Sequence, residues 1–299
     1  MDAWSSSWHL IREAAGAWVD DDATSLGAAL AYYSLFSAAP LLLVVVAIAG
    51  VVFGEPAARE AILGQVESLI GPASSAAVRM GLESLDRPAV GKAAAAVGLG
   101  VILFGATSVF VELQRAMDRI WDAPAAPPRA GLWRLVRSRV LSFGMVLAIG
   151  FLLIVSLVVS AALAAVATLW RPWFADLAML AQAFNAAVST LFLTALFAMI
   201  YKWLPRVTVA WRDVWLGAAI TALLMTVGKT LIGLYIGRSG VASAYGAAAS
   251  VIALLLWVYY SSLIFLFGAE LTATYSRQYG SRREVSAPRQ QPALTKVPA

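Results

Sequence analysis

Hydrophobic residues are gathered into long, nearly uninterrupted runs along this chain of 299 residues. Each run has roughly the 18 residues or more that a helix needs to cross a bilayer of about 30 Å. Hydrocarbon offers no partner to free backbone groups, so each run is expected to be helical. The pattern predicts an all-α, polytopic membrane protein. The six predicted transmembrane helices cover residues 26–53, 93–111, 140–169, 180–201, 214–236 and 247–275.

The N-terminal segment 1–22 has a different pattern, with one apolar stripe at helical spacing. The stripe consists of Trp4, Trp8, Ile11, Ala15 and Trp18. Tryptophan prefers the level of the lipid headgroups. The segment is therefore predicted to be an amphipathic, interfacial helix that lies on the membrane before the first span. A helix packed on the loops is the alternative.

The remaining segments flank or connect the predicted transmembrane domain, 23–277. Segment 54–92 has two short apolar-faced stretches that are separated at Gly71-Pro72. Glycine followed by proline breaks a helix, so a helical hairpin that caps the outer mouth of the bundle is predicted. The second span is expected to continue as a polar helix to Trp121. The tail 278–299, rich in Arg, Gln and Pro, is predicted to be disordered.

The distribution of charge predicts the orientation. Only 13% of the residues are charged, against about 25% in soluble domains. Of the 22 Lys and Arg residues, fifteen fall on the N-terminal side of the predicted membrane and six on the other. Since basic residues are concentrated in cytoplasmic loops, both termini are expected in the cytoplasm. The same bias explains the net charge of +5, so nucleic acid is not an expected partner.

Lys229 is the most unusual residue of the predicted spans, because it interrupts the apolar fifth span. An ammonium group in hydrocarbon costs at least a few kcal/mol. Thr226 and Thr230 lie on the same side of the helix. Lys229 is 16 residues, or roughly 24 Å, from Asp213. Either the ammonium faces a cavity and binds an anionic group or a coupling ion, or it snorkels to the outer headgroups.

A second candidate region surrounds Pro40, which interrupts the backbone hydrogen bonds of the first span. Tyr32, Tyr33 and Ser37 lie beside it. Discontinuous helices often mark binding sites in transporters, although a packing kink is an equal alternative. In the sixth span, Trp257 and Ser261 belong to a patterned face; packing is expected for most residues of this face, and the alternative for a few of them is that they line a path.

Charged residues are also predicted to meet at the cytoplasmic ends of the spans. They would form either a salt-bridge network that locks the helix ends or a gate that opens when the pairs break. The residues are Glu112, Arg115, Arg119, Lys202, Arg212 and Glu270. Lys229 and Glu270 are expected to lie towards opposite leaflets and not to pair.

Motifs of catalysis and of cofactor or metal binding are absent from the sequence. It contains no GxSxG, HExxH or Walker A pattern and no cysteine. The only acidic cluster is Asp20–Asp22, which is predicted to cap the first span; metal binding is the alternative. No enzymatic activity, cofactor or metal is therefore expected.

Several stretches resemble the YihY/BrkB family of bacterial inner-membrane proteins. They are GAALAYYSLFSAAPLLLV (27–44), FGATSVFVELQRAMDRIW (104–121), YKWLPRVTVAWRDVWLGA (201–218), GKTLIGLYI (228–236) and YGAAASVIALLLWVYYSSLIFLFGAELT (245–272). The resemblance covers about residues 18–277. It implies a bacterial inner membrane location. Some members carry a glutamate where this chain has Thr226, so a Glu–Lys pair within that helix is not available here.

The function predicted from these features is that of a transporter or flippase-like protein for an amphipathic anionic, lipid-like molecule. A secondary ion exchanger and a non-transporting scaffold for envelope assembly are the alternatives. The family has also been labelled ribonuclease BN, but no site for RNA hydrolysis is apparent. The expected partners are membrane lipids and an unknown amphipathic or ionic substrate.

Overall fold

The computed structural model describes residues 3–85, 108–124, 178–238 and 248–282, together with Gly144 and Tyr245. Regular structure within these ranges is entirely helical. The helices are α1 (Ala3–Asp20), α2 (Ala23–Phe53), α3 (Glu55–Ile70), α4 (Pro72–Leu85), a helix at 108–120, α7 (Ala178–Trp203), α8 (Trp211–Arg238) and α10 (Ala249–Gln278). The predicted span 140–169, most of span 93–111 and the tail after Arg282 lie outside the described residues.

Four of the described helices are long and apolar enough to cross a membrane. The candidate spans are Ala23–Val51, Ala186–Trp203, Trp211–Ile236 and Ala249–Gln278. They correspond to the predicted first, fourth, fifth and sixth spans. The 30 residues of α10 extend over about 45 Å, which is longer than the hydrocarbon layer. Part of α10 is therefore free to pack outside the bilayer.

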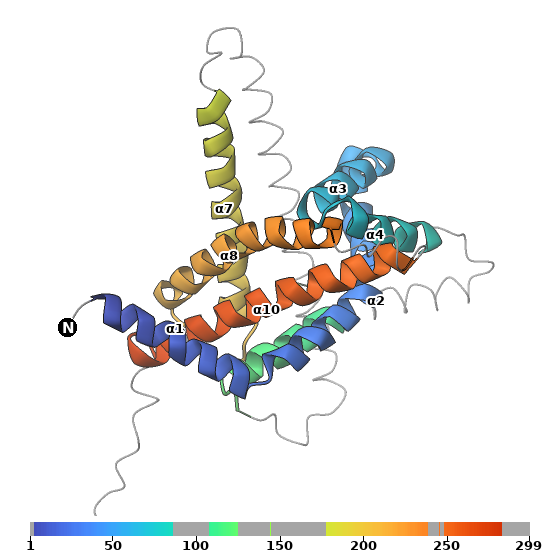
Figure 1. Cartoon of the computed structure of the whole chain (residues 1–299). Helices are drawn as coiled ribbons and strands as arrows, with labels where there is room; N and C mark the ends of the chain where they lie inside the picture. Colours follow the sequence, from blue (N-terminus) through green and yellow to red (C-terminus); the bar gives the residue numbers. More distant parts are fainter. Residues whose placement is uncertain are drawn as a thin grey trace, which may run out of the picture.

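Helix α10 lies at the centre of the described structure and packs against α1, α2, α4 and α8 (Figure 1). Along its C-terminal half it is covered by α1, where Leu10 and Ala14 pack against Leu271. Gly27 of α2 lies against Leu263, near the middle of α10. Helix α2 therefore begins to cover α10 at this point. Helices α3 and α4 lie at the opposite end of α10 from α1.

Helices α8 and α10 approach closely through two matched Gly-x-x-x-Thr segments. A Cβ atom at Gly217 would lie 1.8 Å from Oγ1 of Thr272, and one at Gly268 would lie 1.8 Å from Oγ1 of Thr221. Each glycine thus makes room for the threonine of the other helix. The two hydroxyls donate back to the carbonyls of their own helices, Thr221 to Gly217 and Thr272 to Gly268, both at 2.7 Å. The small-residue faces of these spans therefore serve packing.

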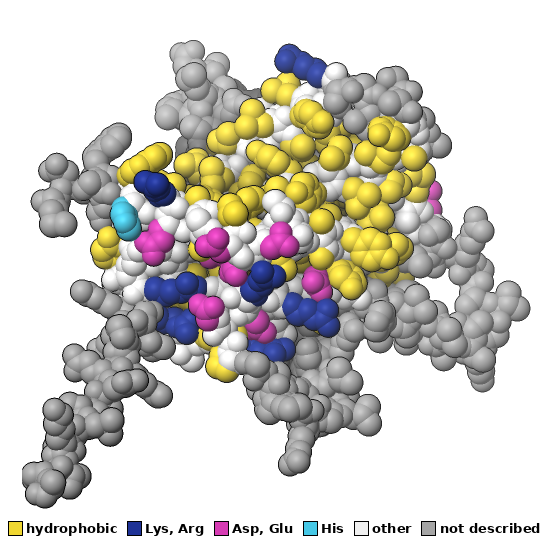
Figure 2. Space-filling view, turned by 60° about the horizontal axis from the view of Figure 1, so that its bottom comes forward, with side chains coloured by type: hydrophobic (Ala, Val, Ile, Leu, Met, Phe, Trp, Pro, Cys, Tyr) yellow, Lys and Arg dark blue, Asp and Glu magenta, His cyan; other side chains and the backbone are white. Residues whose placement is uncertain are grey.

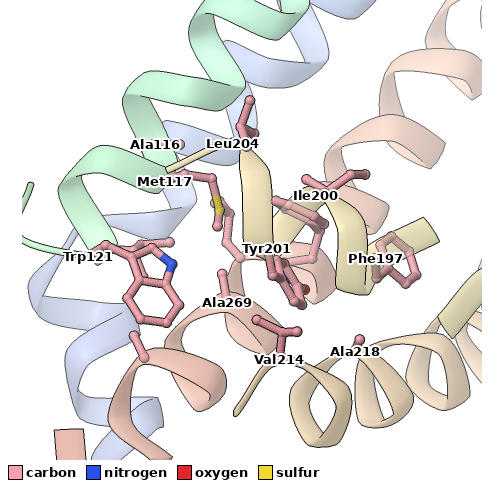
Figure 3. Close-up of a cluster of buried hydrophobic side chains, with 14 of the residues drawn as sticks. Ala116, Met117, Trp121, Phe197, Ile200, Tyr201, Leu204, Val214, Ala218 and Ala269 are labelled. Atoms are coloured by element: carbon pink, nitrogen blue, oxygen red, sulfur yellow. The ribbon is translucent and has the colours of Figure 1, made fainter. Parts of the chain in front are cut away.

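The main hydrophobic core joins the helix at 108–120 to α7, α8 and α10. Met117, Trp121 and Tyr201 are almost fully buried there and point towards one another (Figure 3). The hydroxyl of Tyr201 donates to the carbonyl of Phe265 at 2.8 Å and lies 3.0 Å from the hydroxyl of Thr221. The hydroxyl of Tyr201 thus lies at the close crossing of α8 and α10, while its ring lies in the hydrophobic core.

A second core holds α3 and α4 against α2. Ile62 of α3 and Val78 of α4 are buried against Val46 of α2. The two helices are separated at Gly71, whose φ of 82° suits glycine, followed by Pro72, as the sequence indicated. Their predicted role as a cap over an outer mouth stays a prediction, because the structure contains no membrane.

Helix α2 continues through Pro40 as one helix. A Cβ atom at Gly81 of α4 would lie 2.9 Å from Cβ of Ala39, so α4 packs tightly beside the proline. Pro40 is buried. This contact supports a packing role for Pro40. A role for Pro40 beside a binding site stays a prediction.

The apolar stripe of α1 is largely on its outer side. Trp8 is 68% exposed and Ile11 44%, while the opposite side buries Leu10 and Ala14. The indole N–H of Trp18 donates to the carbonyl of Leu263 at 3.3 Å. Helix α1 is thus anchored to α10 on one side and presents apolar side chains on the other, as an interfacial helix would.

Candidate functional site

Most of the described ion pairs are gathered at one end of the structure, here called the polar end. The polar end comprises the turn Asp20–Asp22, residues 112–122, residues 202–213 and residues 270–282. Charged side chains crowd together here, whereas hydrophobic side chains cover the neighbouring surface (Figure 2). The pairs are Arg115–Glu112 at 3.0 Å, Arg119–Asp21 at 3.4 Å, Arg206–Asp118 at 3.2 Å, Arg212–Asp213 at 3.8 Å and Arg277–Asp122 at 3.5 Å.

Asp213 joins the start of α8 to the C-terminal end of α10. Its Oδ2 accepts hydrogen bonds from the hydroxyl of Ser276 at 2.9 Å and from the hydroxyl and backbone N–H of Ser281 at 2.6 and 2.8 Å. The side chain is almost fully buried. Such charge-assisted hydrogen bonds to a buried carboxylate are strong. Asp213 is therefore predicted to have a structural role.

Arg282 and Arg277 attach the end of α10 to the helix at 108–120. Arg282 donates to the carbonyl of Trp121 at 3.0 Å, and Arg277 donates to the carbonyl of Ile120. The chain is thus packed as far as Arg282, and the predicted disordered tail beyond it lies outside the described residues.

Glu270 is the exceptional group of the polar end. Its side chain is fully buried, and neither carboxylate oxygen has a hydrogen-bond partner within the described structure. Asp21, Asp122 and Arg277 are its charged neighbours. A buried carboxylate without donors is costly unless a proton, a cation or a rearranged donor compensates it. Glu270 is therefore a candidate functional residue.

Asp118 illustrates how burial and pairing compete at the polar end. Burial raises the pKa of Asp118 above its ordinary value, and the backbone N–H and the guanidinium of Arg206 oppose this rise. The backbone N–H of Arg206 donates to Oδ1 of Asp118 at 2.9 Å. This bond ties the loop after α7 to the helix at 108–120.

The predicted cytoplasmic residues are thus gathered at this end, and Glu112 pairs with Arg115, but Arg119 and Arg212 pair with aspartates outside the predicted set. Lys202 donates to the carbonyl of Val209 and lies 5.9 Å from the ring centre of Trp211. Glu112 pairs within its own helix, and Glu270 is paired with none of the predicted basic residues. The sequence reasoning missed the acidic partners Asp21, Asp118, Asp122 and Asp213. The feature of the sequence that could have identified these aspartates is their position near the ends of helices.

Lys229 lies on the exposed side of α8, together with Thr226 and Thr230. The neighbouring Gly228 is buried, and a Cβ atom there would lie 2.9 Å from the ring of Tyr260 on α10. The Thr226 hydroxyl donates to the carbonyl of Ala222 at 2.8 Å. The ammonium of Lys229 has no ion-pair partner among the described residues.

The candidate residues of α2 and α10 differ in exposure. Tyr32 is 58% exposed, and its ring lies 5.6 Å from that of Tyr33. Ser37 is buried and donates to the carbonyl of Ser34. Ser261 is buried and Trp257 is half-buried. Both α2 and α8 pack against α10, the helix that carries Trp257 and Ser261.

The acidic turn Asp20–Asp22 was the candidate for metal binding in the sequence. Among the described residues, no group of three His, Cys, Asp or Glu is placed to hold a metal ion. Asp21 instead pairs with Arg119, and Asp22 precedes α2 with a left-handed backbone, φ 52°. The acidic turn is therefore occupied in connecting α1, α2 and the helix at 108–120.

Apolar helices of spanning length, an ion-paired polar end and isolated ionisable groups within the spans define a multi-pass, helical membrane protein. The chain matches the virulence factor BrkB family over residues 14–293 and belongs to that family. The family resemblance noted in the sequence is thereby confirmed.

Three similar proteins are described as UPF0761 membrane proteins. One from Pseudomonas aeruginosa (strain LESB58) is 30% identical over 86% of this chain and 60% of its own length. One from Azotobacter vinelandii is 29% identical over 88% of this chain and 62% of its own length. One from Pseudoalteromonas translucida is 29% identical over 86% of this chain and 83% of its own length. The chain therefore spans about 60% of the length of the Pseudomonas and Azotobacter proteins. No solved structure matches this chain significantly.

Proposed function

We propose that the protein moves an amphipathic anionic molecule, such as a lipid, across the bacterial inner membrane. The observation that carries the proposal is a cation on an apolar surface. Lys229 lies on the exposed side of α8, among the exposed side chains of Val227, Leu231 and Leu234. An apolar surface with a single positive charge is complementary to an apolar chain with an anionic head.

The position of Lys229 within a candidate span strengthens this proposal. Trp211–Ile236 is the candidate span, and Lys229 stands seven residues before its end. Ionisable groups within spans are costly and commonly mark substrate or ion pathways. The ammonium has no described partner, so a substrate anion would lower its cost. Tyr32, Tyr33, Ser37 and Pro40 of α2, with Trp257 and Ser261 of α10, are proposed as further contacts along the path.

Reconstitution in liposomes tests the role of Lys229. The measurement is the rate at which a fluorescent anionic phospholipid becomes accessible to a membrane-impermeant quencher. Lys229→Met should slow this rate at least tenfold, and Lys229→Arg should retain most of it, because only the charge is required. Arg238→Met is the matched control, since Arg238 is the other basic residue in the C-terminal part of α8. If Lys229→Met is as fast as the parent, Lys229 has no such role.

Ion exchange is the second candidate function, and it is favoured by Glu270. A buried carboxylate without donors can accept an exchangeable proton or monovalent cation, which neutralises it. Its proximity to Asp21, Asp122 and Arg277 means that binding of a cation there would also alter the forces on the ion pairs of the polar end.

Proton flux in the same liposomes distinguishes this second function. Glu270→Gln should abolish proton movement that is coupled to an ion gradient, because the amide cannot exchange a proton. Glu83→Gln, at an exposed position of α4, is the control and should leave the flux unchanged. Flux that does not depend on pH, or no flux at all, would exclude the exchanger. If lipid movement is also absent, a scaffold for envelope assembly remains, and it predicts stable co-purifying partners.

A further inference from the structure

Glu270 meets a second carboxyl group at the polar end. The side chain of Asp21, in the turn between α1 and α2, lies within hydrogen-bonding reach of the Glu270 carboxyl group. Glu270 is fully buried, and no donor group within the described structure bonds to either of its oxygens. Two ionised carboxylates cannot bond to each other, because each of them only accepts. A hydrogen bond between Asp21 and Glu270 therefore requires a proton on one of the two.

The ion pairs around Glu270 leave it as the carboxyl group without a cation of its own. Asp122 and Arg277 also face it, but Arg277 pairs with Asp122 at 3.5 Å. Asp21 pairs with Arg119 at 3.4 Å through Oδ1, so its other oxygen can accept a bond from Glu270. Each aspartate thus has one guanidinium group, and the negative charge in excess belongs to Glu270.

The charged groups of the other helices that pack on α10 are engaged elsewhere. Asp213, at the start of α8, accepts a hydrogen bond from Ser276. Glu13 of α1 accepts one from Gln278. Helix α2 contains no charged residue, and α4 lies at the other end of α10. A proton is therefore the group that both neutralises Glu270 and joins it to its neighbour.

We propose that Asp21 and Glu270 share one proton, and that this proton fastens the turn between α1 and α2 to α10. Glu270 holds the proton and donates it in a hydrogen bond to Asp21, which stays ionised beside Arg119. Asp21 is 29% exposed, so it connects the buried carboxyl group to water, and the proton leaves by that route.

Loss of the proton would leave two carboxylates in contact, one of them buried, and their repulsion would open the turn. The attachment is therefore complete at low pH and is lost as the pH rises. The inference concerns the same carboxyl group as the ion-exchange candidate. It does not rest on exchange, because a bound proton is detected without any flux.

Infrared spectroscopy of the full chain in detergent at pH 7 tests whether the proton is present. A protonated carboxyl group has a C=O stretching band that a carboxylate lacks. The parent should show this band, and Glu270→Gln should remove the part that belongs to one carboxyl group. Asp21→Asn should shift or remove the same part, because the hydrogen-bond partner of Glu270 has changed. Glu83→Gln, at an exposed position of α4, is the control and should leave the band unchanged.

The reactivity of Ala23→Cys tests whether the proton holds the turn. Ala23 directly follows the turn and is 1% exposed, so a cysteine there reacts with a maleimide only when the turn opens. Val19→Cys, at a position that is 67% exposed, corrects for the effect of pH on the thiol itself. The ratio of the two rates should rise several-fold as the pH is raised from 6 to 9. Glu270→Gln should remove this rise, because its amide has no proton to lose and still donates to Asp21.

Three results would overturn the proposal. A band that is absent from the parent, or unchanged in Glu270→Gln, would mean that Glu270 is not protonated. A band that changes in Glu270→Gln and not in Asp21→Asn would mean that Asp21 does not share the proton. A ratio of rates that is independent of pH, or that rises equally in Glu270→Gln, would mean that the proton does not hold the turn. The ion-exchange function fails separately, when the band is present and no proton flux is measured.

Discussion

At the residue scale, single glycines decide how closely the central helices approach. At Gly268, a Cβ atom would lie 1.8 Å from Oγ1 of Thr221 and 2.7 Å from the hydroxyl of Tyr201. Both oxygens are buried and hydrogen-bonded, so neither can withdraw without losing a partner. The identity of residue 268 is thus determined by atoms of α7 and α8.

Gly268→Ala should accordingly destabilise the protein by about 1–3 kcal/mol, the usual cost of overpacking. Gly233→Ala is the matched control in α8, because a Cβ atom there has no neighbour within 4 Å. The control should be neutral or slightly stabilising, since alanine favours a helix over glycine by up to about 1 kcal/mol. Thermal unfolding in detergent measures both. Equal melting temperatures for the two variants would contradict the close contact.

The pKa of Asp118 is raised by burial, and this predicts a dependence of stability on pH. The folded state binds a proton at a higher pH than the unfolded state does. The contribution of Asp118 to stability is therefore present at low pH and lost as the pH rises through its folded pKa. Asp118→Asn, which still accepts from Arg206, removes this dependence.

The expected result is that Asp118→Asn is at least as stable as the parent at pH 7 and loses that advantage as the pH falls towards 4. The measurement is the difference in melting temperature between the two proteins at each pH. An advantage that grows as the pH falls would reverse the sign and exclude a raised pKa.

At the scale of elements, α1 acts as a helix with two apolar sides. One side packs on α10 through Leu10 and Ala14, and the other exposes Trp8 and Ile11. The amphipathic pattern in the sequence indicated only one of these sides, the tryptophan stripe. The packed side consists of Leu10 and Ala14. Leucine and alanine occur throughout this chain, so these two positions form no distinctive pattern in the sequence.

Enlarging the packed side of α1 should separate it from α10. Ala14 is fully buried, so Ala14→Leu should lower stability by about 1–3 kcal/mol through overpacking. Gly16→Leu, two residues further on and without neighbours within 4 Å, should cause no comparable loss. Limited proteolysis of the N-terminal segment gives the readout. If both variants resist protease equally, α1 is not held by this side.

At the scale of the whole molecule, charge is concentrated at one end and hydrophobic surface covers the adjoining helices. The polar end joins segments that are far apart in sequence, such as Asp118 with Arg206 and Asp213 with Ser281. Helices α3 and α4 lie at the opposite end of α10. The positive-inside bias predicts that the polar end lies in the cytoplasm and that α3 and α4 lie outside, and this orientation can be tested.

Single cysteines provide that test, because the natural chain contains none. Gly64→Cys in α3 should react with a membrane-impermeant maleimide added to intact cells, since Gly64 is exposed. His9→Cys in α1 should react only after the membrane is permeabilised. The reverse pattern of labelling would invert the proposed topology.

Several features followed from the sequence because they depend on local pattern. The apolar runs predicted α2, α7, α8 and α10 nearly to their ends, because the cost of free backbone groups in hydrocarbon requires helices there. The Gly71-Pro72 pair predicted the break between α3 and α4. The motifs within 27–44 and 245–272 indicated the family.

Only the tertiary structure decided which side chains meet. Glu270 looked like one member of a salt-bridge network, but it is buried, and neither of its carboxylate oxygens has a hydrogen-bond partner among the residues that the structure describes. The sequence pattern did not single out Asp213, which the structure shows to be a hydrogen-bonded junction. Pairing of this kind depends on the packing of distant helices, and no local pattern encodes it. The sequence by itself therefore determined the helices and their family, because hydrophobic length is a local property. The partners of the charged groups were decided only when the helices packed.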